Sequence, residues 1–143
     1  MELSSEQYQT LADVVSGRPE VDVLYLYGSY ATSAANRLSD VDLAILVSDE
    51  VPETRYFDLR RELIAVFASR LENENIDLIV LNNAPAHLAF ETIAPRRILY
   101  EREPDRRVEF ETRAVNRFMD FRPFLEVRRA YLKRQLAEGT FFG

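Results

Sequence analysis

The sequence is organised around two stretches, VDVLYLYGSY at residues 21–30 and SDVDLAILV at residues 39–47. Val21–Tyr27 and Val41–Val47 are rich in β-branched, aliphatic and aromatic residues, which predicts two strands. The first strand ends at Gly28-Ser29, and glycine allows the backbone to turn sharply and a ligand to approach closely. If a helix follows, its free N–H groups and the serine hydroxyl form a small anion site.

The second strand begins at two acids, Asp40 and Asp42. Side chains alternate across a strand, so both carboxylates are expected on the same face. Two crowded carboxylates raise each other's pKa unless a cation lies between them, and a hard cation such as Mg²⁺ suits oxygen ligands. In the alternative interpretation, Asp40 is only a turn residue and Asp42 only faces solvent.

A third acid, Asp77, lies near the start of a further apolar run at residues 76–81. If this third strand is a neighbour of the second, Asp77 can join Asp40 and Asp42. Three carboxylates could then hold two metal ions about 3.5–4 Å apart, which is the arrangement used for in-line attack at phosphorus. A phosphate-binding turn beside such a set is what phosphoryl or nucleotidyl transfer requires.

The remaining sequence predicts an α+β fold in which helices flank a small mixed sheet. Helices are predicted over residues 4–16, 53–71 and 86–93, a helical turn over 30–36 and a weak fourth strand over 97–100. From Pro104 onward the pattern is helical, and Pro123 is expected to separate two C-terminal helices. We expect one domain over residues 1–143, with a core at about 1–103 and a helical segment at about 104–138.

Composition excludes several classes of protein. The chain has no Cys and one His, which rules out a disulfide framework, a cysteine nucleophile and a paired-histidine zinc site. The polar N-terminus and the lack of a long apolar run predict a cytoplasmic protein with no signal peptide and no membrane contact. The net charge of −6 argues against a nucleic-acid-coating protein.

The motif Gly28-Ser29, ten residues, Asp40-x-Asp42 resembles the signature of the DNA polymerase β-like nucleotidyltransferase superfamily. The resemblance is closest to the minimal nucleotidyltransferases (MNT proteins), and it covers most of the chain. It includes Ile76-Asp77-Leu78, Leu81-Asn82 and Leu99-Tyr100-Glu101, and the run at 120–125 also looks like the MNT antitoxins.

This resemblance implies an antitoxin of a type VII HEPN/MNT toxin–antitoxin system. Such a protein uses Mg²⁺ and ATP to attach AMP to a tyrosine of a bound HEPN ribonuclease toxin. By position, Asp40, Asp42 and Asp77 would be the catalytic residues and the ligands of two Mg²⁺ ions. The nucleotide-binding residues would be Gly28, Ser29, Tyr30 and Arg37.

Two features leave alternatives open. Many relatives carry an Arg-Gly pair after the Gly-Ser turn, whereas this chain has Ala31-Thr32-Ser33-Ala34, so Arg37 would have to compensate. Tyr30 could stack on adenine or only pack in the core. The rival functions are a nucleotidyltransferase acting on a small molecule such as an aminoglycoside, and a non-catalytic antitoxin that binds and occludes its toxin.

The basic C-terminal third is interpreted as a surface for a protein partner. Arginine is favoured over lysine at protein interfaces, and aromatic residues are interleaved with the arginines of this segment. The role of Arg96-Arg97 and of Phe141-Phe142 is left open between partner contact and ordinary surface or packing. His87 follows no arginine at the Arg-x4–6-His spacing of HEPN toxins, so this chain is not itself the toxin.

Overall fold

The computed structural model describes residues 2–31, 40–94 and 96–138, which form four strands and five α-helices within those ranges. The elements, in chain order, are α1 (Ser5–Ser16), β1 (Val21–Tyr27), α2 (Gly28–Ala31), β2 (Val41–Val47), α3 (Tyr56–Leu71), β3 (Ile76–Val80), α4 (Ala86–Ile93), β4 (Arg97–Glu101) and α5 (Pro104–Glu138). Short 3₁₀ turns at Glu53–Arg55 and Leu81–Asn83 precede α3 and follow β3.

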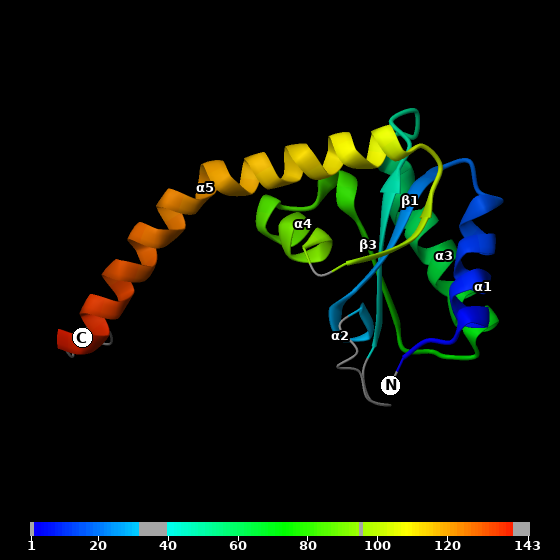
Figure 1. Ribbon diagram of the computed structural model, residues 1–143, viewed down its shortest axis with the longest axis horizontal. Helices are drawn as coiled ribbons and strands as arrows, with labels where there is room; N and C mark the ends of the chain where they lie inside the picture. Colours follow the sequence, from blue (N-terminus) through cyan, green and yellow to red (C-terminus); the bar gives the residue numbers. More distant parts are fainter. Residues whose placement is uncertain (1, 32–39, 95, 139–143) are drawn as a thin grey trace.

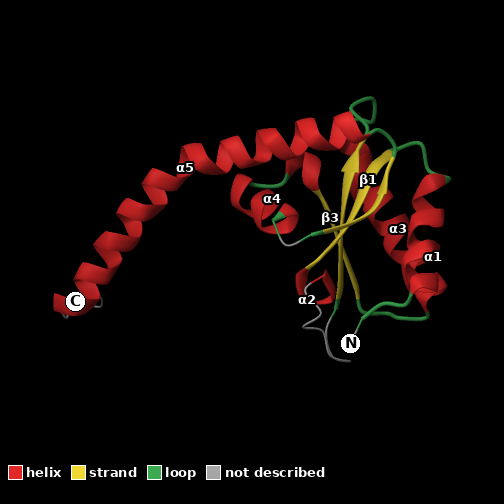
Figure 2. Ribbon diagram, in the orientation of Figure 1, coloured by secondary structure: helices red, strands yellow, loops and turns green. Residues whose placement is uncertain are grey.

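The four strands form one mixed sheet in the order β3-β2-β1-β4 (Figure 2). β1 is antiparallel to both β2 and β4, whereas β2 and β3 run parallel. The parallel pair needs a crossover, which α3 supplies. The α+β fold with a small mixed sheet flanked by helices is therefore confirmed.

Each face of the sheet carries its own hydrophobic core. On one face α1 and α3 cover the sheet, and fully buried Leu11, Leu59 and Phe67 pack against strand residues such as Leu43. On the other face α4 and the start of α5 cover a second cluster that includes Tyr25 and Ala89. Figure 1 shows the two pairs of helices on opposite sides of the sheet. The central strands β1 and β2 are buried almost throughout because both faces are covered.

The C-terminal segment forms one long helix, so the expected break at Pro123 and the expectation of separate C-terminal helices are wrong. α5 runs from Pro104 to Glu138 and changes direction part-way along its length (Figure 1). A proline inside a helix removes one backbone hydrogen bond and crowds the preceding turn, and this can bend a helix without ending it. Among the described residues, no helix is both long enough and apolar enough to cross a membrane.

Arginines at the start of α5 attach this helix to the core. Arg106 lies 2.8 Å from Asp49 and 3.4 Å from Asp22, and Arg107 pairs with Glu101 and, at 2.6 Å, with Glu111. Further along, the rings of Phe90 and Phe118 stack 4.1 Å apart and join α4 to α5. These basic residues act within the chain, which corrects the expectation that the whole arginine run is available to a partner.

The other boundaries follow local sequence signals. Ser4 precedes α1 and forms a capping box with Gln7, so the helix predicted over 4–16 begins one residue later. The helix predicted over 53–71 begins as a 3₁₀ turn, and the third strand ends at Val80 because Leu81 opens the next turn. The helical turn predicted over 30–36 overlaps α2 only at Tyr30 and Ala31, since α2 begins at Gly28, and residues 32–39 lie outside the described residues.

Candidate active site

Two of the three predicted carboxylates lie side by side on neighbouring strands. In the parallel pairing of β2 with β3, Asp42 is directly opposite Asp77, and in the antiparallel pairing of β1 with β2 it is opposite Tyr27. Asp42 lies two residues before Ala44 and four before Leu46 on β2, so all three side chains point to the same face of the sheet. Ala44 and Leu46 belong to the core under α4 and α5, and Asp42 therefore points to that face. Asp40 is exposed and lies two residues earlier. The sheet therefore brings Asp42 and Asp77 together at one end of one face, and Asp40 lies just before β2.

The turn after β1 approaches the Asp42 side chain closely. Gly28 has a φ of +70°, which non-glycine residues adopt only with strain. A Cβ atom at this position would lie 2.3 Å from Oδ2 of Asp42. The missing side chain of Gly28 therefore leaves the space that the carboxylate occupies, and this links the Gly-Ser half of the motif physically to its Asp-x-Asp half.

The electrostatics of the site disfavour additional negative charge. Burial, Asp77 and Asp40, in that order, raise the pKa of Asp42 above its ordinary value. Burial first, and then Asp42 and Asp77, raise the pKa of the neighbouring Tyr27 to about 12. The group of carboxylates thus destabilises its own ionised form and would be stabilised by a cation.

The high pKa of Tyr27 can be measured directly. In an alkaline ultraviolet titration, the difference between wild type and Tyr27→Phe should show one tyrosine ionising near pH 12, above the ordinary value of about 10. The folded chain then holds the Tyr27 proton more tightly than the unfolded chain does. The contribution of Tyr27 to the free energy of unfolding therefore falls as the pH rises from 10 to 12. Repeating the comparison in an Asp42→Asn background should lower the midpoint. A step near pH 10 in the wild-type background would contradict the geometry.

The chemistry of the donor set fits a hard divalent cation. In the described part of the chain, no three carboxylate, imidazole or thiol side chains are already gathered as ligands of one ion. The charges nevertheless act on each other, as the raised pKa of Asp42 shows, and carboxylate oxygens are the ligands that Mg²⁺ prefers. Asp40, Asp42 and Asp77 are therefore the residues that could hold such an ion.

The predicted nucleotide-binding residues are less completely described. Gly28 lies at the site, the side chain of Ser29 and all of Arg37 lie outside the described residues, and Tyr30 is 5% exposed within the core under α1 and α3. This burial favours the packing role of Tyr30 that the sequence left open.

Other candidate residues lie away from the carboxylates. Arg96 pairs with Glu111 at 2.9 Å, and the Arg97 guanidinium lies 5.1 Å from the centre of the Tyr8 ring, so both have partners within the chain. Exposed His87 precedes the buried part of α4 and lines a pocket with Arg117. Phe141 and Phe142 lie outside the described residues.

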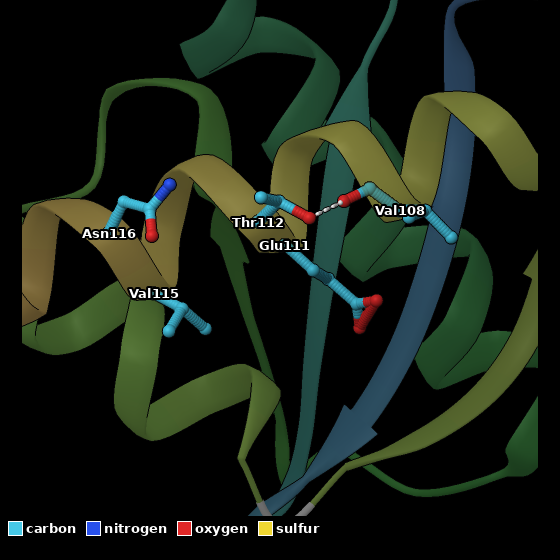
Figure 3. Close-up of a pocket in the computed structure, with 5 residues that line it drawn as sticks. All are labelled: Val108, Glu111, Thr112, Val115 and Asn116. Atoms are coloured by element: carbon cyan, nitrogen blue, oxygen red, sulfur yellow. Dashed lines mark hydrogen bonds between the residues drawn. The ribbon is translucent and has the colours of Figure 1, made fainter.

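A pocket of about 300 Å³ lies along α5 and is drawn in Figure 3. Its lining residues all come from α5: Val108, Glu111, Thr112, Val115 and Asn116. Glu111 turns its carboxylate toward the sheet, and the Thr112 hydroxyl donates to the Val108 carbonyl at 2.8 Å (Figure 3). This lining contains one carboxylate and no basic side chain, so it offers a triphosphate no opposite charge.

One residue of the site was missed from the sequence. Arg60 of α3 lies with its Nη2 atom 3.5 Å from Oδ1 of Asp77. The spacing of residues 53–71 does not distinguish Arg60 from Arg61. Arg60 reaches the edge of the sheet only because the chain crosses over from α3 to β3. A sequence signal for it would have required the sheet order.

The comparisons with known proteins agree with this geometry. The family model described as "Polymerase beta, Nucleotidyltransferase" matches residues 9–105, which include β1, β2, β3 and all three acids. The chain belongs to the polymerase beta nucleotidyltransferase family. The resemblance inferred from the Gly-Ser and Asp-x-Asp motifs is thereby confirmed. The matched residues end in the first turn of α5, so the family assignment covers the sheet and most of the helices packed on it, but not the rest of α5.

This nucleotidyltransferase resembles one curated protein in sequence and several solved structures in fold. It is 29% identical over 87 residues to protein adenylyltransferase MntA of Shewanella oneidensis; the match covers 61% of this chain and only 59% of that relative. A crystal structure of a toxin–antitoxin with AMP-PNP superimposes with a TM-score of 0.66 at 23% identity, covering 94% of this chain and 99% of the other. A structure of the tri-AMPylated Shewanella oneidensis HEPN toxin in complex with MNT antitoxin gives 0.60 at 21% identity, covering 92% and 98%. These structures share the fold.

Proposed function

We propose that this nucleotidyltransferase is the antitoxin of a type VII HEPN/MNT system and transfers AMP from ATP, with Mg²⁺, to a tyrosine of a HEPN ribonuclease toxin. The observation that carries the proposal is the in-register pair Asp42–Asp77 beside the Gly28 turn, in a chain of this family. The naming of MntA as a protein adenylyltransferase supports the reaction, and the neighbours with AMP-PNP and with an AMPylated HEPN toxin support the substrates.

In the proposed reaction the tyrosine hydroxyl oxygen of the partner attacks the α-phosphorus of ATP. The new O–P bond forms as the bond to the β-phosphate oxygen breaks, so pyrophosphate leaves and the hydroxyl proton is released. Mg²⁺, when bound, would neutralise phosphate charge and lower the pKa of the attacking hydroxyl.

The chain's own residues supply position and charge for this reaction. Asp40 and Asp42 would hold both ions and Asp77 the ion nearest the attacking hydroxyl, so that the three acids orient acceptor and nucleotide from one face of the sheet. Gly28 keeps the Asp42 carboxylate accessible because no Cβ fills its place. Tyr27 stays protonated at neutral pH, because its pKa is about 12, and adds no negative charge where ATP must approach.

The acceptor is proposed to be a protein because the fold offers little of its own to enclose a small molecule. Apart from the sheet and the helices that cover it, the described chain adds only the second half of α5, which extends away from the core (Figure 1). A protein acceptor brings its own surface to an open site. As expected from the sequence, we place this reaction in the cytoplasm.

A labelling experiment tests the reaction. The chain is mixed with its cognate HEPN protein, recognised as a short helical protein with an Arg-x4–6-His motif encoded beside it, and with ATP labelled at either the α- or the γ-phosphate. AMP transfer predicts that label from the α-position alone appears on the HEPN protein, and only with a divalent cation present. Neutralisation of the toxin with neither label transferred would support occlusion instead.

A further inference from the structure

We propose that Arg60 is a positioning residue that orients the Asp77 carboxylate for AMP transfer. This inference rests on the proposed function, and it goes further by assigning a role to an α3 residue outside the family's acid and Gly-Ser motif. Arg60 would act through Asp77 without itself contacting the nucleotide.

The first observation is that Arg60 is attached to the backbone of β3. Its Nε–H donates to the Leu78 carbonyl oxygen at 2.6 Å. β3 is an edge strand whose one neighbour in the described sheet is β2. The Leu78 bond therefore supplies the sheet edge with a donor from α3 and fixes the guanidinium one residue from Asp77.

The second observation is the direction of the remaining donors. With Nε held at Leu78, Nη2 reaches Oδ1 of Asp77 at 3.5 Å. A guanidinium is planar and presents its donors as a rigid fork, so anchoring one nitrogen restricts where the others lie. Buried Leu59 and Leu63 hold α3 against the sheet on either side of Arg60 in the sequence. The Arg60 side chain is 41% exposed and that of Asp77 46% exposed, so the hydrogen bond to Leu78 is what fixes the guanidinium beside the carboxylate.

The third observation is the surroundings of the pair. Arg60 and Leu78 line a cavity of about 380 Å³ along the outer edge of β3, together with Tyr56 and Phe57. Asp77 has Asp42 beside it on the neighbouring strand β2, and the Arg60 guanidinium lies near its carboxylate from the other side. The Arg60 guanidinium is a cation, and it opposes binding of a second cation by the Asp77 carboxylate. We therefore expect Arg60 to orient this carboxylate and, at the same time, to weaken its affinity for a divalent metal ion.

This opposition gives a test that separates positioning from general support of the fold. Arg60→Ala should lower kcat for AMP transfer about tenfold, with KM for ATP unchanged within twofold, because a misplaced reacting group slows chemistry more than binding. Without ATP, the same variant should bind Mn²⁺ at least about threefold more tightly, measured by electron paramagnetic resonance, because a competing positive charge is gone. Arg60→Lys should recover only part of kcat, since lysine keeps the charge and loses the fork.

Arg61→Ala is the matched control. Arg61 is the next residue of α3 and also lies 3.5 Å from an aspartate, Asp58, but this pair is fully on the surface. Its substitution should change neither kcat nor Mn²⁺ binding by more than twofold. The proposal is overturned if Arg60→Ala keeps wild-type kcat, if it binds Mn²⁺ as wild type does or more weakly, or if the wild-type chain binds no Mn²⁺. If wild type binds Mn²⁺ but transfers no AMP, the proposed function fails, and the Mn²⁺ comparison alone decides the role of Arg60.

Discussion

Replacing Asp40 and Asp42 together by asparagine is expected to reduce AMP transfer by more than about 100-fold while the chain stays folded. Asp40 is exposed just before β2, and Asp42, near the start of β2, is directly opposite Asp77. Asparagine keeps the size of the side chain and removes the charge that would hold the divalent cation. The measurement is the initial rate of label transfer from α-labelled ATP to the HEPN partner.

The same double substitution should leave stability at neutral pH unchanged or raised. The pKa of Asp42 is raised in the folded chain, so the folded state holds this proton more tightly than the unfolded state does. Stability therefore falls as the pH rises through the raised pKa, and the cost persists at neutral pH. An asparagine removes this cost. Catalytic sites commonly show this exchange of stability for activity.

Asp13→Asn is a suitable control for the double substitution, since Asp13 is an exposed acid on α1. It should leave transfer unchanged within twofold. If the double variant transferred AMP at the wild-type rate, these acids would not be the metal ligands. A melting temperature several degrees below wild type would show that the carboxylates stabilise the fold, contrary to the repulsion described above.

Gly28→Ala should be nearly as damaging to transfer, for a steric reason. The new Cβ would lie 2.3 Å from Oδ2 of Asp42, so the carboxylate or the turn must move. The φ of +70° adds strain of about 1–3 kcal/mol for a residue with a side chain. We expect transfer to fall by about 100-fold, since a displacement of about 1 Å at a reacting group has that effect. Thermal unfolding and the transfer rate are the two measurements.

Gly17→Ala provides the matched comparison. Gly17 ends α1 with an ordinary φ of −84°, and its added Cβ would meet nothing closer than 3.9 Å. This substitution should be neutral or stabilise the chain by up to about 1 kcal/mol, with transfer unchanged. If the two glycine variants behaved alike, the close approach of Gly28 to Asp42 would not matter for the reaction.

The sequence predicted those parts of the fold that local patterns determine. The strands at Val21–Tyr27 and Val41–Val47 have the predicted bounds, because β-branched and aromatic runs ending at a glycine or beginning at acids leave little ambiguity. The pattern left the order of the strands open. The neighbouring positions of Asp42 and Asp77 depended on β2 and β3 being adjacent and in register, which is a property of the whole sheet.

The errors have identifiable physical causes. Pro123 was expected to end a helix, yet α5 continues through it, because a long helix can lose one backbone hydrogen bond without ending. Arg106 and Arg107 were assigned to a partner surface, whereas acids distant in sequence, Asp22 and Asp49 among them, hold Arg106 within the chain. Such long-range pairs, like that of Arg60 with Asp77, leave no periodic trace in the sequence.

The charge asymmetry of the chain now has a structural interpretation. Residues 1–90 carry a net charge of −9 and residues 91–143 a net charge of +3. Part of the negative charge is the candidate metal-binding set, and part of the positive charge attaches α5 to the core. Other basic residues of α5, such as Arg117 and Arg129, are exposed and are the ones available to the proposed HEPN partner.

AMP transfer by this chain is tested by the intact mass of the HEPN partner after incubation with the wild-type chain, ATP and Mg²⁺. We expect the partner to gain the mass of one or more whole adenylyl groups, located on tyrosine by peptide fragmentation, and to gain none with the Asp40→Asn, Asp42→Asn variant. An unchanged partner mass with wild type, under conditions in which the toxin is neutralised, would contradict this expectation.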